Sequence, residues 1–254
     1  KVVVTPAAET GRKRGQEYAS EWYGPIQDKE FDIRSSLGWL YNASGTDGFS
    51  ISGLSSQSTI SYNTIITPFK EVNYLSAPQV LLSIGDSAST ANAFFVAIGS
   101  FTSLMTNEYI VVGKGGNRHG VVSGIESLPA DTPVMITVTC TPSSTKIYIN
   151  SVLKTSIDGS SGGVLSGTSG LTVDRVTLSA MVQDGNKIRF PFQGRQAHDS
   201  LWNIELNQSQ VTELYNNYNN NGGLGNSQYD LSTHLSWGNV IKYYRRNDVI
   251  DESN

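Results

Sequence analysis

The stretch from residue 192 to residue 215 constrains the fold most strongly, because the spacing of its apolar residues changes from that of a strand to that of a helix. After a predicted turn at Gly194, segment 200–206 indicates a short buried strand with the apolar residues Leu201, Trp202, Ile204 and Leu206. Asn207 can then cap a helix, with Gln210 three residues on. The residues at i, i+3, i+4 and i+7 of that helix are Val211, Leu214, Tyr215 and Tyr218. This apolar stripe predicts a helix that lies against a sheet.

The rest of the chain is predicted to form a series of short strands. Ser, Thr, Asn and Gly separate runs of β-branched and aromatic residues, which is typical of an antiparallel sandwich. A turn is predicted at Asn150 and Ser151, and a wide hairpin loop at the glycine-rich segment 113–120. The better strand candidates are residues 64–69, 79–84, 93–98, 109–112, 134–140, 146–153 and 171–181.

Length and composition narrow the class further. A chain of 254 residues suits one large all-β domain with extensions. Its single cysteine, Cys140, excludes an intrachain disulfide and is expected to be a packed strand residue. With a net charge of −4 and 16% charged residues, general attraction to nucleic acid is not expected. No apolar run approaches the roughly 18 residues that cross a membrane, so no membrane partner is expected.

The segment from residue 192 to residue 215 resembles the closing segment of laminin-G-like and pentraxin-like jelly rolls, which have the concanavalin A-like architecture. In those domains a Phe-x-Gly turn precedes a strand, an Ile-Trp-Asn-like triplet, a cap and a Glu-Leu-Tyr-like helix. The matching residues are Phe192, Gly194, Leu201, Trp202, Asn203, Leu206, Glu213, Leu214 and Tyr215. The resemblance implies an all-β antiparallel jelly-roll sandwich over residues 48–217, with one short helix near its C-terminal end.

Both ends fall outside that span. Residues 1–47 form a predicted N-terminal arm, which either folds back on its own sandwich or contacts neighbouring subunits. Residues 218–254 form a predicted Asn/Gly-rich loop and a C-terminal tail strand, and a surface loop is expected over 216–226. This tail resembles a segment of laminin-G-like virion proteins of tailed phages. The matching residues are Tyr215, Asn216, Asn217, Asp230, Leu231, Ser232, Tyr243, Tyr244, Arg245, Asp251 and Ser253.

Motifs for catalysis are not found in the sequence. No Glu-x-Asp-x-x-Glu strand of the glucanase type occurs, and no histidine has a second ligand at metal-site spacing. Gln196-Ala-His198 copies one of the three elements of jelly-roll polysaccharide lyases, which we interpret as coincidence. We therefore predict no catalytic residues.

The family resemblance also implies candidate ligands. Laminin-G-like and pentraxin-like domains often hold calcium at the rim of the sandwich, through carboxylate, amide and carbonyl oxygens. The loop candidates for a possible Ca²⁺ site are Asp86, Asp174, Asp184 and Asn186. No other cofactor is predicted. Exposed tyrosine and tryptophan side chains could stack on a glycan.

The leading hypothesis from the sequence is a non-enzymatic virion structural protein on the particle exterior, as a capsid decoration, fibre or tail-associated subunit. The arm and the tail would contact other virion or self subunits, and rim loops would bind a host-surface glycan. The alternative is a secreted or cell-surface carbohydrate-binding or adhesion module. A polysaccharide hydrolase or lyase is the third reading.

Overall fold

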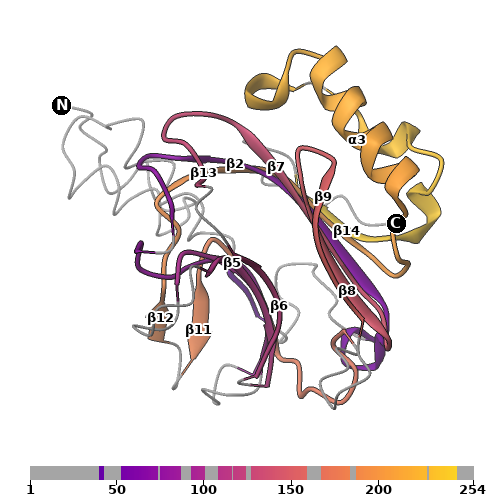
Figure 1. Ribbon diagram of the computed structural model, residues 1–254. Coiled ribbons are helices and arrows are strands. Elements are labelled where there is room, and N and C mark those ends of the chain that lie inside the picture. Colours follow the sequence, from indigo (N-terminus) through magenta and orange to yellow (C-terminus); the bar gives the residue numbers. More distant parts are fainter. Residues whose placement is uncertain are drawn as a thin grey trace, which may run out of the picture.

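In the computed structural model, two antiparallel β-sheets lie face to face (Figure 1). The structure describes residues 40–42, 53–73, 75–86, 93–100, 108–115, 117–123, 127–158, 167–183, 187–227 and 229–244. Within these ranges each sheet has six strands. The predicted all-β antiparallel jelly-roll sandwich is confirmed.

Strands that are distant in sequence lie next to each other in both sheets. Sheet 1 has the spatial order β1 (Leu40–Asn42), β10 (Arg175–Leu178), β3 (Gln79–Gly85), β4 (Ala93–Ile98), β5 (Glu108–Lys114) and β6 (Asn117–Ser123). Sheet 2 has the order β14 (Val240–Tyr244), β13 (Gly194–Trp202), β2 (Ile60–Pro68), β7 (Val134–Cys140), β8 (Ser144–Ile149) and β9 (Val152–Asp158). A further hairpin pairs β11 (Met181–Gln183) with β12 (Lys187–Arg189).

The main core fills the space between the two sheets. Successive side chains of a strand point to opposite faces, so Ile136, Val138 and Cys140 of β7 all point inward. Phe94, Val96 and Ile98 of β4 face them from sheet 1. Burial raises the pKa of the Cys140 thiol, as expected for a packed and unreactive side chain. The predicted role of this cysteine as a core residue is confirmed.

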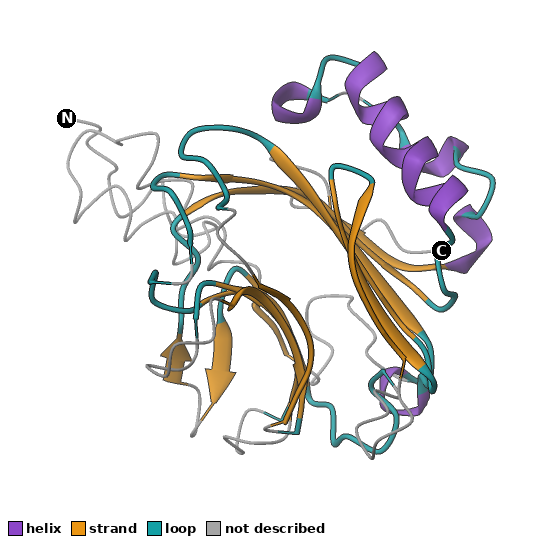
Figure 2. Ribbon diagram, viewed as in Figure 1, coloured by secondary structure: helices purple, strands orange, loops and turns teal. Residues whose placement is uncertain are grey.

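A second apolar cluster lies outside sheet 2, where α3 (Gln208–Asn220) covers the sheet (Figure 2). The helix begins with a capping box, in which the Asn207 side chain accepts from the Gln210 backbone and the Gln210 side chain accepts from the Asn207 backbone. Val211, Leu214 and Tyr218 are buried against the sheet. The predicted cap and apolar stripe are confirmed. Because α3 covers this face, β7 is buried on both sides.

The predicted turn between the β8 and β9 segments is also confirmed. Asn150 has φ 48° and Ser151 has φ 63°, so both residues of the two-residue connection are left-handed. This is the type I′ turn, whose twist matches that of the strands it joins. Asparagine tolerates the conformation better than most residues, and its Oδ1 also accepts from the Met135 backbone at 2.9 Å.

Four predicted boundaries were wrong. The strand expected at 200–206 begins at Gly194 and ends at Trp202, because its backbone pairs with β2 from Gly194 onward. The loop expected at 216–226 begins only after α3 ends at Asn220. The hairpin loop at 113–120 is tight, since β5 ends at Lys114 and β6 begins at Asn117. The strand expected at 171–181 is interrupted at Ser179, whose φ of 59° separates β10 from β11.

The predicted arm and the predicted tail each contribute one strand to the sheets. β1 pairs with β10 of the same chain, and β14 pairs with β13. Among the described residues, the arm therefore folds back on its own sandwich at 40–42. Residues 1–39, 43–47 and 245–254 lie outside the described residues, including Arg245, Asp251 and Ser253 of the tail resemblance. The division into 1–47, 48–217 and 218–254 stays a prediction.

Candidate functional site

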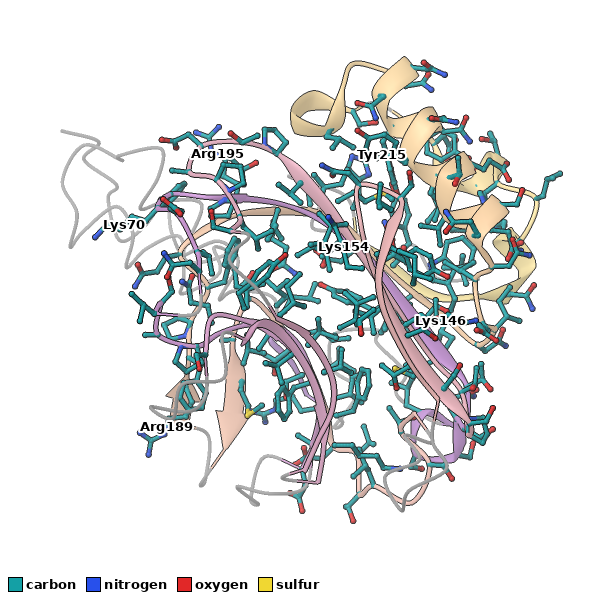
Figure 3. The ribbon with its side chains drawn as sticks, viewed as in Figure 1. Lys70, Lys146, Lys154, Arg189, Arg195 and Tyr215 are labelled. Carbon is teal, nitrogen blue, oxygen red and sulfur yellow. The ribbon has the colours of Figure 1, made fainter. Side chains whose placement is uncertain are left out.

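The residues of the closing motif occupy three different environments. The Phe192 ring packs against Gly194, where an added Cβ would lie 2.3 Å from Phe192 Cζ. Leu201 joins the core between the sheets, whereas Trp202, Leu206 and Leu214 are buried under α3. Asn203 is exposed, and Tyr215 lies partly exposed on α3 (Figure 3). Most of the motif therefore forms the structure, whereas Asn203 and Tyr215 reach the surface.

A β-bulge in β13 decides which of its polar side chains face the core. Ala197 pairs with Ile65 and Ser200 with Asn63, so His198 and Asp199 together oppose Thr64. His198 has φ 55°, a left-handed conformation for a non-glycine residue. The extra residue shifts the alternation of the strand by one position. As a result, Gln196 and Asp199 point into the sandwich, and His198 points out under α3.

His198 connects the sheet to the C-terminal elements. Its Nε2 lies 3.1 Å from the Ser227 carbonyl oxygen, and its Nδ1 lies 2.7 Å from the Tyr243 hydroxyl. A carbonyl can only accept, so Nε2 carries the proton and Nδ1 accepts from Tyr243. The imidazole also packs on Tyr218 of α3, with 4.9 Å between ring centroids. Gln196 and His198 thus serve opposite faces and do not form the converging pair of a lyase.

Three side chains of sheet 2 form a polar network between the sheets. Tyr62 donates to Asp199 Oδ1 at 2.5 Å, and Gln196 Nε2 donates to the same oxygen at 2.6 Å. Gln196 also donates to the Leu81 carbonyl of sheet 1 at 2.9 Å, and its Oε1 accepts from Ser179 at 2.7 Å. Burial raises the pKa of Asp199 to about 6, against hydrogen bonds from Tyr62, Gln196 and Thr64 that lower it.

Two of the four predicted calcium ligands come together. Asp86 follows β3 and Asp174 precedes β10, and because Arg175 pairs with Gly85, the two aspartates are neighbours at one end of sheet 1. The Asp174 amide donates to the Gly85 carbonyl at 3.0 Å. Asp184 and Asn186 lie outside the described residues. In the part of the chain that the structure describes, no group of three or more His, Cys, Asp or Glu residues could hold a metal. Calcium stays a prediction.

The outer face of sheet 1 carries an aromatic ring between small residues. Phe95 of β4 points outward, because Phe94 and Val96 on either side of it point into the core. Its partners across the sheet are Ser83 on β3 and Gly113 on β5. Phe95 is partly exposed, and Val80, Ala97, Met181 and Phe190 pack beside it. The small residues Ser83 and Gly113 on either side are buried, so the partly exposed group at this point of the face is the ring itself.

A charged and a hydroxylated residue border that ring. Thr177 of β10 pairs with Ser83, so two hydroxyl-bearing side chains continue the row that begins at Phe95. Arg175, also on β10, is opposite Gly85 and faces outward like Thr177, two positions along the strand. Two strand spacings, roughly 10 Å, separate the strand of Arg175 from that of Phe95. Ser83 is 4% and Thr177 1% exposed, so the partly exposed residues of this row are the Phe95 ring and the Arg175 side chain.

Sequence reasoning did not single out these residues. The alternation of Phe94 and Phe95 identifies a strand with two buried faces, and nothing local says which phenylalanine faces outward. Arg175 joins the face through the pairing of β10 with β3, about 90 positions away in the chain. That pairing has no local signal.

Glu205, in the segment after β13, is part of an ion pair. Its Oε1 lies 2.6 Å from Lys146 Nζ, and both side chains are about one third exposed. Lys146 extends from β8 (Figure 3) and connects the strand to the segment after β13. The ion pair links β8 to the segment after β13.

Within the described residues, no helix is long and apolar enough to cross a membrane.

No protein-family model matches the chain, and no curated protein matches it. Solved structures do. A candidate carbohydrate-binding protein from Bacteroides ovatus is similar over 74% of this chain and 45% of its own length, with a TM-score of 0.51 and 16% identity. The CBM40 module of the Ruminococcus gnavus IT-sialidase, bound to α2,3-sialyllactose, is similar over 70% of this chain and 91% of its own, with a TM-score of 0.51 and 15% identity.

The NanB sialidase of Streptococcus pneumoniae is similar over 68% of this chain and 26% of its own length, with a TM-score of 0.50 and 15% identity. The present chain spans less than half the length of the Bacteroides ovatus protein, as the 45% coverage states. At these identities the likeness is one of fold. The chain has the jelly-roll β-sandwich fold that these proteins share.

Proposed function

We propose that the protein is a carbohydrate-binding protein that contacts sugar through the outer face of sheet 1. The observation that carries this proposal is Phe95, a partly exposed ring with Ser83 and Gly113 as its neighbours. A flat ring that is partly exposed packs against the C–H face of a pyranose.

The polar residue of the same face that suits a ligand rich in hydroxyl groups is Arg175, which is partly exposed. An arginine offers five N–H donors in a fixed plane. Arg175 would direct those donors at ring or hydroxyl oxygens, or at a carboxylate of an acidic sugar. The proposal includes no chemical step, and the protein acts by binding.

The comparisons support this hypothesis more directly than the virion hypothesis. Two of the similar structures carry carbohydrate binding in their names, and one of them holds sialyllactose. Localisation on a virion exterior, and contacts of the arm and tail with virion subunits, stay predictions from the tail segment. A secreted or cell-surface setting is the alternative, and sugar binding would serve either one.

A glycan array tests the proposal. We expect saturable binding of the wild-type chain to at least one glycan. Phe95→Ala should weaken the affinity for that glycan about tenfold, which corresponds to roughly 1.4 kcal/mol. Tyr215→Ala is a matched control, because Tyr215 is also a partly exposed aromatic residue but lies on α3, outside sheet 2. It should change the affinity less than about twofold.

Circular dichroism of each variant establishes that the fold is kept. The proposal fails if no glycan binds saturably. It also fails if Phe95→Ala binds the glycan as tightly as the wild type, since the ligand would then lie elsewhere. For the virion hypothesis, microscopy of native particles should reveal this chain in contact with other virion chains.

A further inference from the structure

The polar network between the sheets differs from the rest of the core, because it contains an ionisable group. Asp199 is 5% exposed and lies among core residues of both sheets. Its neighbour Tyr62 is 1% exposed. The carboxyl group accepts from Tyr62 and Gln196 at a single oxygen, Oδ1. We define the inter-sheet network as Tyr62, Gln196, Asp199, Ser179 and the Leu81 carbonyl.

We propose that the inter-sheet network takes up a proton at Asp199 in mildly acidic solution, and that the protonated form joins the two sheets more firmly. Sheet 2 supplies Tyr62, Gln196 and Asp199. On the other side of the core, β3 of sheet 1 supplies Leu81, and Ser179 directly follows β10 of sheet 1. The network therefore crosses the core. A change of charge at its centre affects the contact between the sheets.

The groups that face the carboxyl group are mostly neutral. Sheet 2 contributes the Tyr62 hydroxyl, which is itself titratable, Thr64 and the Gln196 amide. The opposite side of the core contributes the Leu81 carbonyl and Ser179. On β14 the residue opposite Asp199 is Tyr244, and the nearby charged residue is Lys242, which pairs with Leu201. Burial is the largest influence on the carboxyl group, and it disfavours the ionised form.

Hydrogen-bond chemistry also accommodates the proton. A protonated carboxyl keeps an oxygen that accepts from Gln196 and gains an O–H donor. Acceptors for that donor are present in the network, since the Tyr62 hydroxyl oxygen and the Leu81 carbonyl are both within it. Burying the neutral acid costs less than burying the anion.

The sign of the pH effect follows from the direction of the shift. The folded-state pKa of Asp199, about 6, is above the ordinary value of 3.8 for an aspartate. The folded form therefore binds a proton that the unfolded form has lost between about pH 4 and pH 6. This contribution to stability is present at the acidic end of that window and is lost as the pH rises through 6.

The test uses Asp199→Asn, which keeps the size and the acceptor oxygen but cannot titrate. The unfolding equilibrium constant is measured in urea at pH values from 4 to 8, for the full chain. We expect the ratio of wild-type to Asp199→Asn constants to rise up to about 100-fold between pH 4 and pH 7 and then to level off. Asp131→Asn, at an exposed aspartate, is the matched control and should give no such rise.

A second measurement needs no variant that alters the core charge. Carboxyl ¹³C NMR of the folded wild type should give Asp199 a midpoint near 6. In Tyr62→Phe the midpoint should move upward, because a hydrogen bond to the ionised form is lost. An Asp199 midpoint near 4, or wild-type and Asp199→Asn stabilities that run parallel with pH, would overturn the proposal.

Discussion

Replacing Trp202 by alanine tests the packing of α3 on sheet 2. The Trp202 side chain is 0% exposed and belongs to the cluster under the helix. Its Nε1 donates to Ser200 Oγ at 3.0 Å, and its ring meets the His234 ring edge-on at a centroid distance of 5.1 Å. A buried indole of about 200 Å² contributes roughly 5 kcal/mol by area. Substitution data for buried aromatic residues give about 3–5 kcal/mol.

We therefore expect Trp202→Ala to lower the free energy of unfolding by about 4 kcal/mol. Urea unfolding followed by far-ultraviolet circular dichroism measures it, and the slope of the transition should stay near that of the wild type. Because total stabilities are about 5–15 kcal/mol, the variant should keep about 1 kcal/mol or more and stay measurable. Trp202→Phe is the milder companion, with an expected loss of about 1–2 kcal/mol from the smaller ring and the lost donor.

The control for this series is Ser209→Ala, at an exposed position in the first turn of α3. It should change the free energy of unfolding by less than about 0.5 kcal/mol. A loss below about 1 kcal/mol for Trp202→Ala would refute the reasoning, since it would mean that the indole is accessible to water and α3 is not packed on it.

Two further predictions concern the closing motif and the segment after the helix. Gly194→Ala should cost about 1–3 kcal/mol in urea unfolding, because the new methyl would lie 2.3 Å from Phe192 Cζ and 2.5 Å from the Thr67 carbonyl oxygen; stability like that of the wild type would mean that Phe192 moves aside freely. Burial lowers the pKa of His234 in the folded protein. The contribution of neutral His234 to the stability of the fold is therefore complete above the unfolded pKa of about 6.5 and is lost as the pH falls. His234→Asn, which keeps an acceptor for the Ser236 amide, should therefore lose less stability than its parent between pH 7 and pH 5, and this comparison is best made in the Asp199→Asn background; equal losses would contradict the assignment.

Local patterns in the sequence were enough for the fold class and for the helix. The cap at Asn207 and the stripe of Val211, Leu214 and Tyr218 depend on residues within a few positions of one another. The start of β13 was missed because Gln196, His198 and Asp199 are polar, which hides the strand. His198 and Asp199 are buried and Gln196 is partly buried, because β2, Ser227 and Leu81 supply hydrogen-bond partners from distant parts of the chain.

The candidate sugar-contact face was beyond local reasoning for a related physical reason. Phe95 is outward because sheet 2 covers the other side of β4, and Arg175 is beside Gly85 because β10 returns to pair with β3. Both facts are properties of strand order. Asp86 and Asp174 were chosen from the sequence as separate loop candidates for calcium, and the same pairing makes them neighbours.

The bulge at His198 also determines how this strand tolerates changes in length. Two residues of β13 oppose one of β2 there, so losing one residue at 197–198 would restore a regular ladder and leave Asp199 and Trp202 on their present faces. Losing a residue between 199 and 201 while the bulge stays at 198 would instead turn Trp202 into the space between the sheets. We therefore expect the protein to fold after a one-residue deletion at the bulge, although the contacts of His198 are lost. We expect it not to fold when the deletion lies one or two residues further along β13.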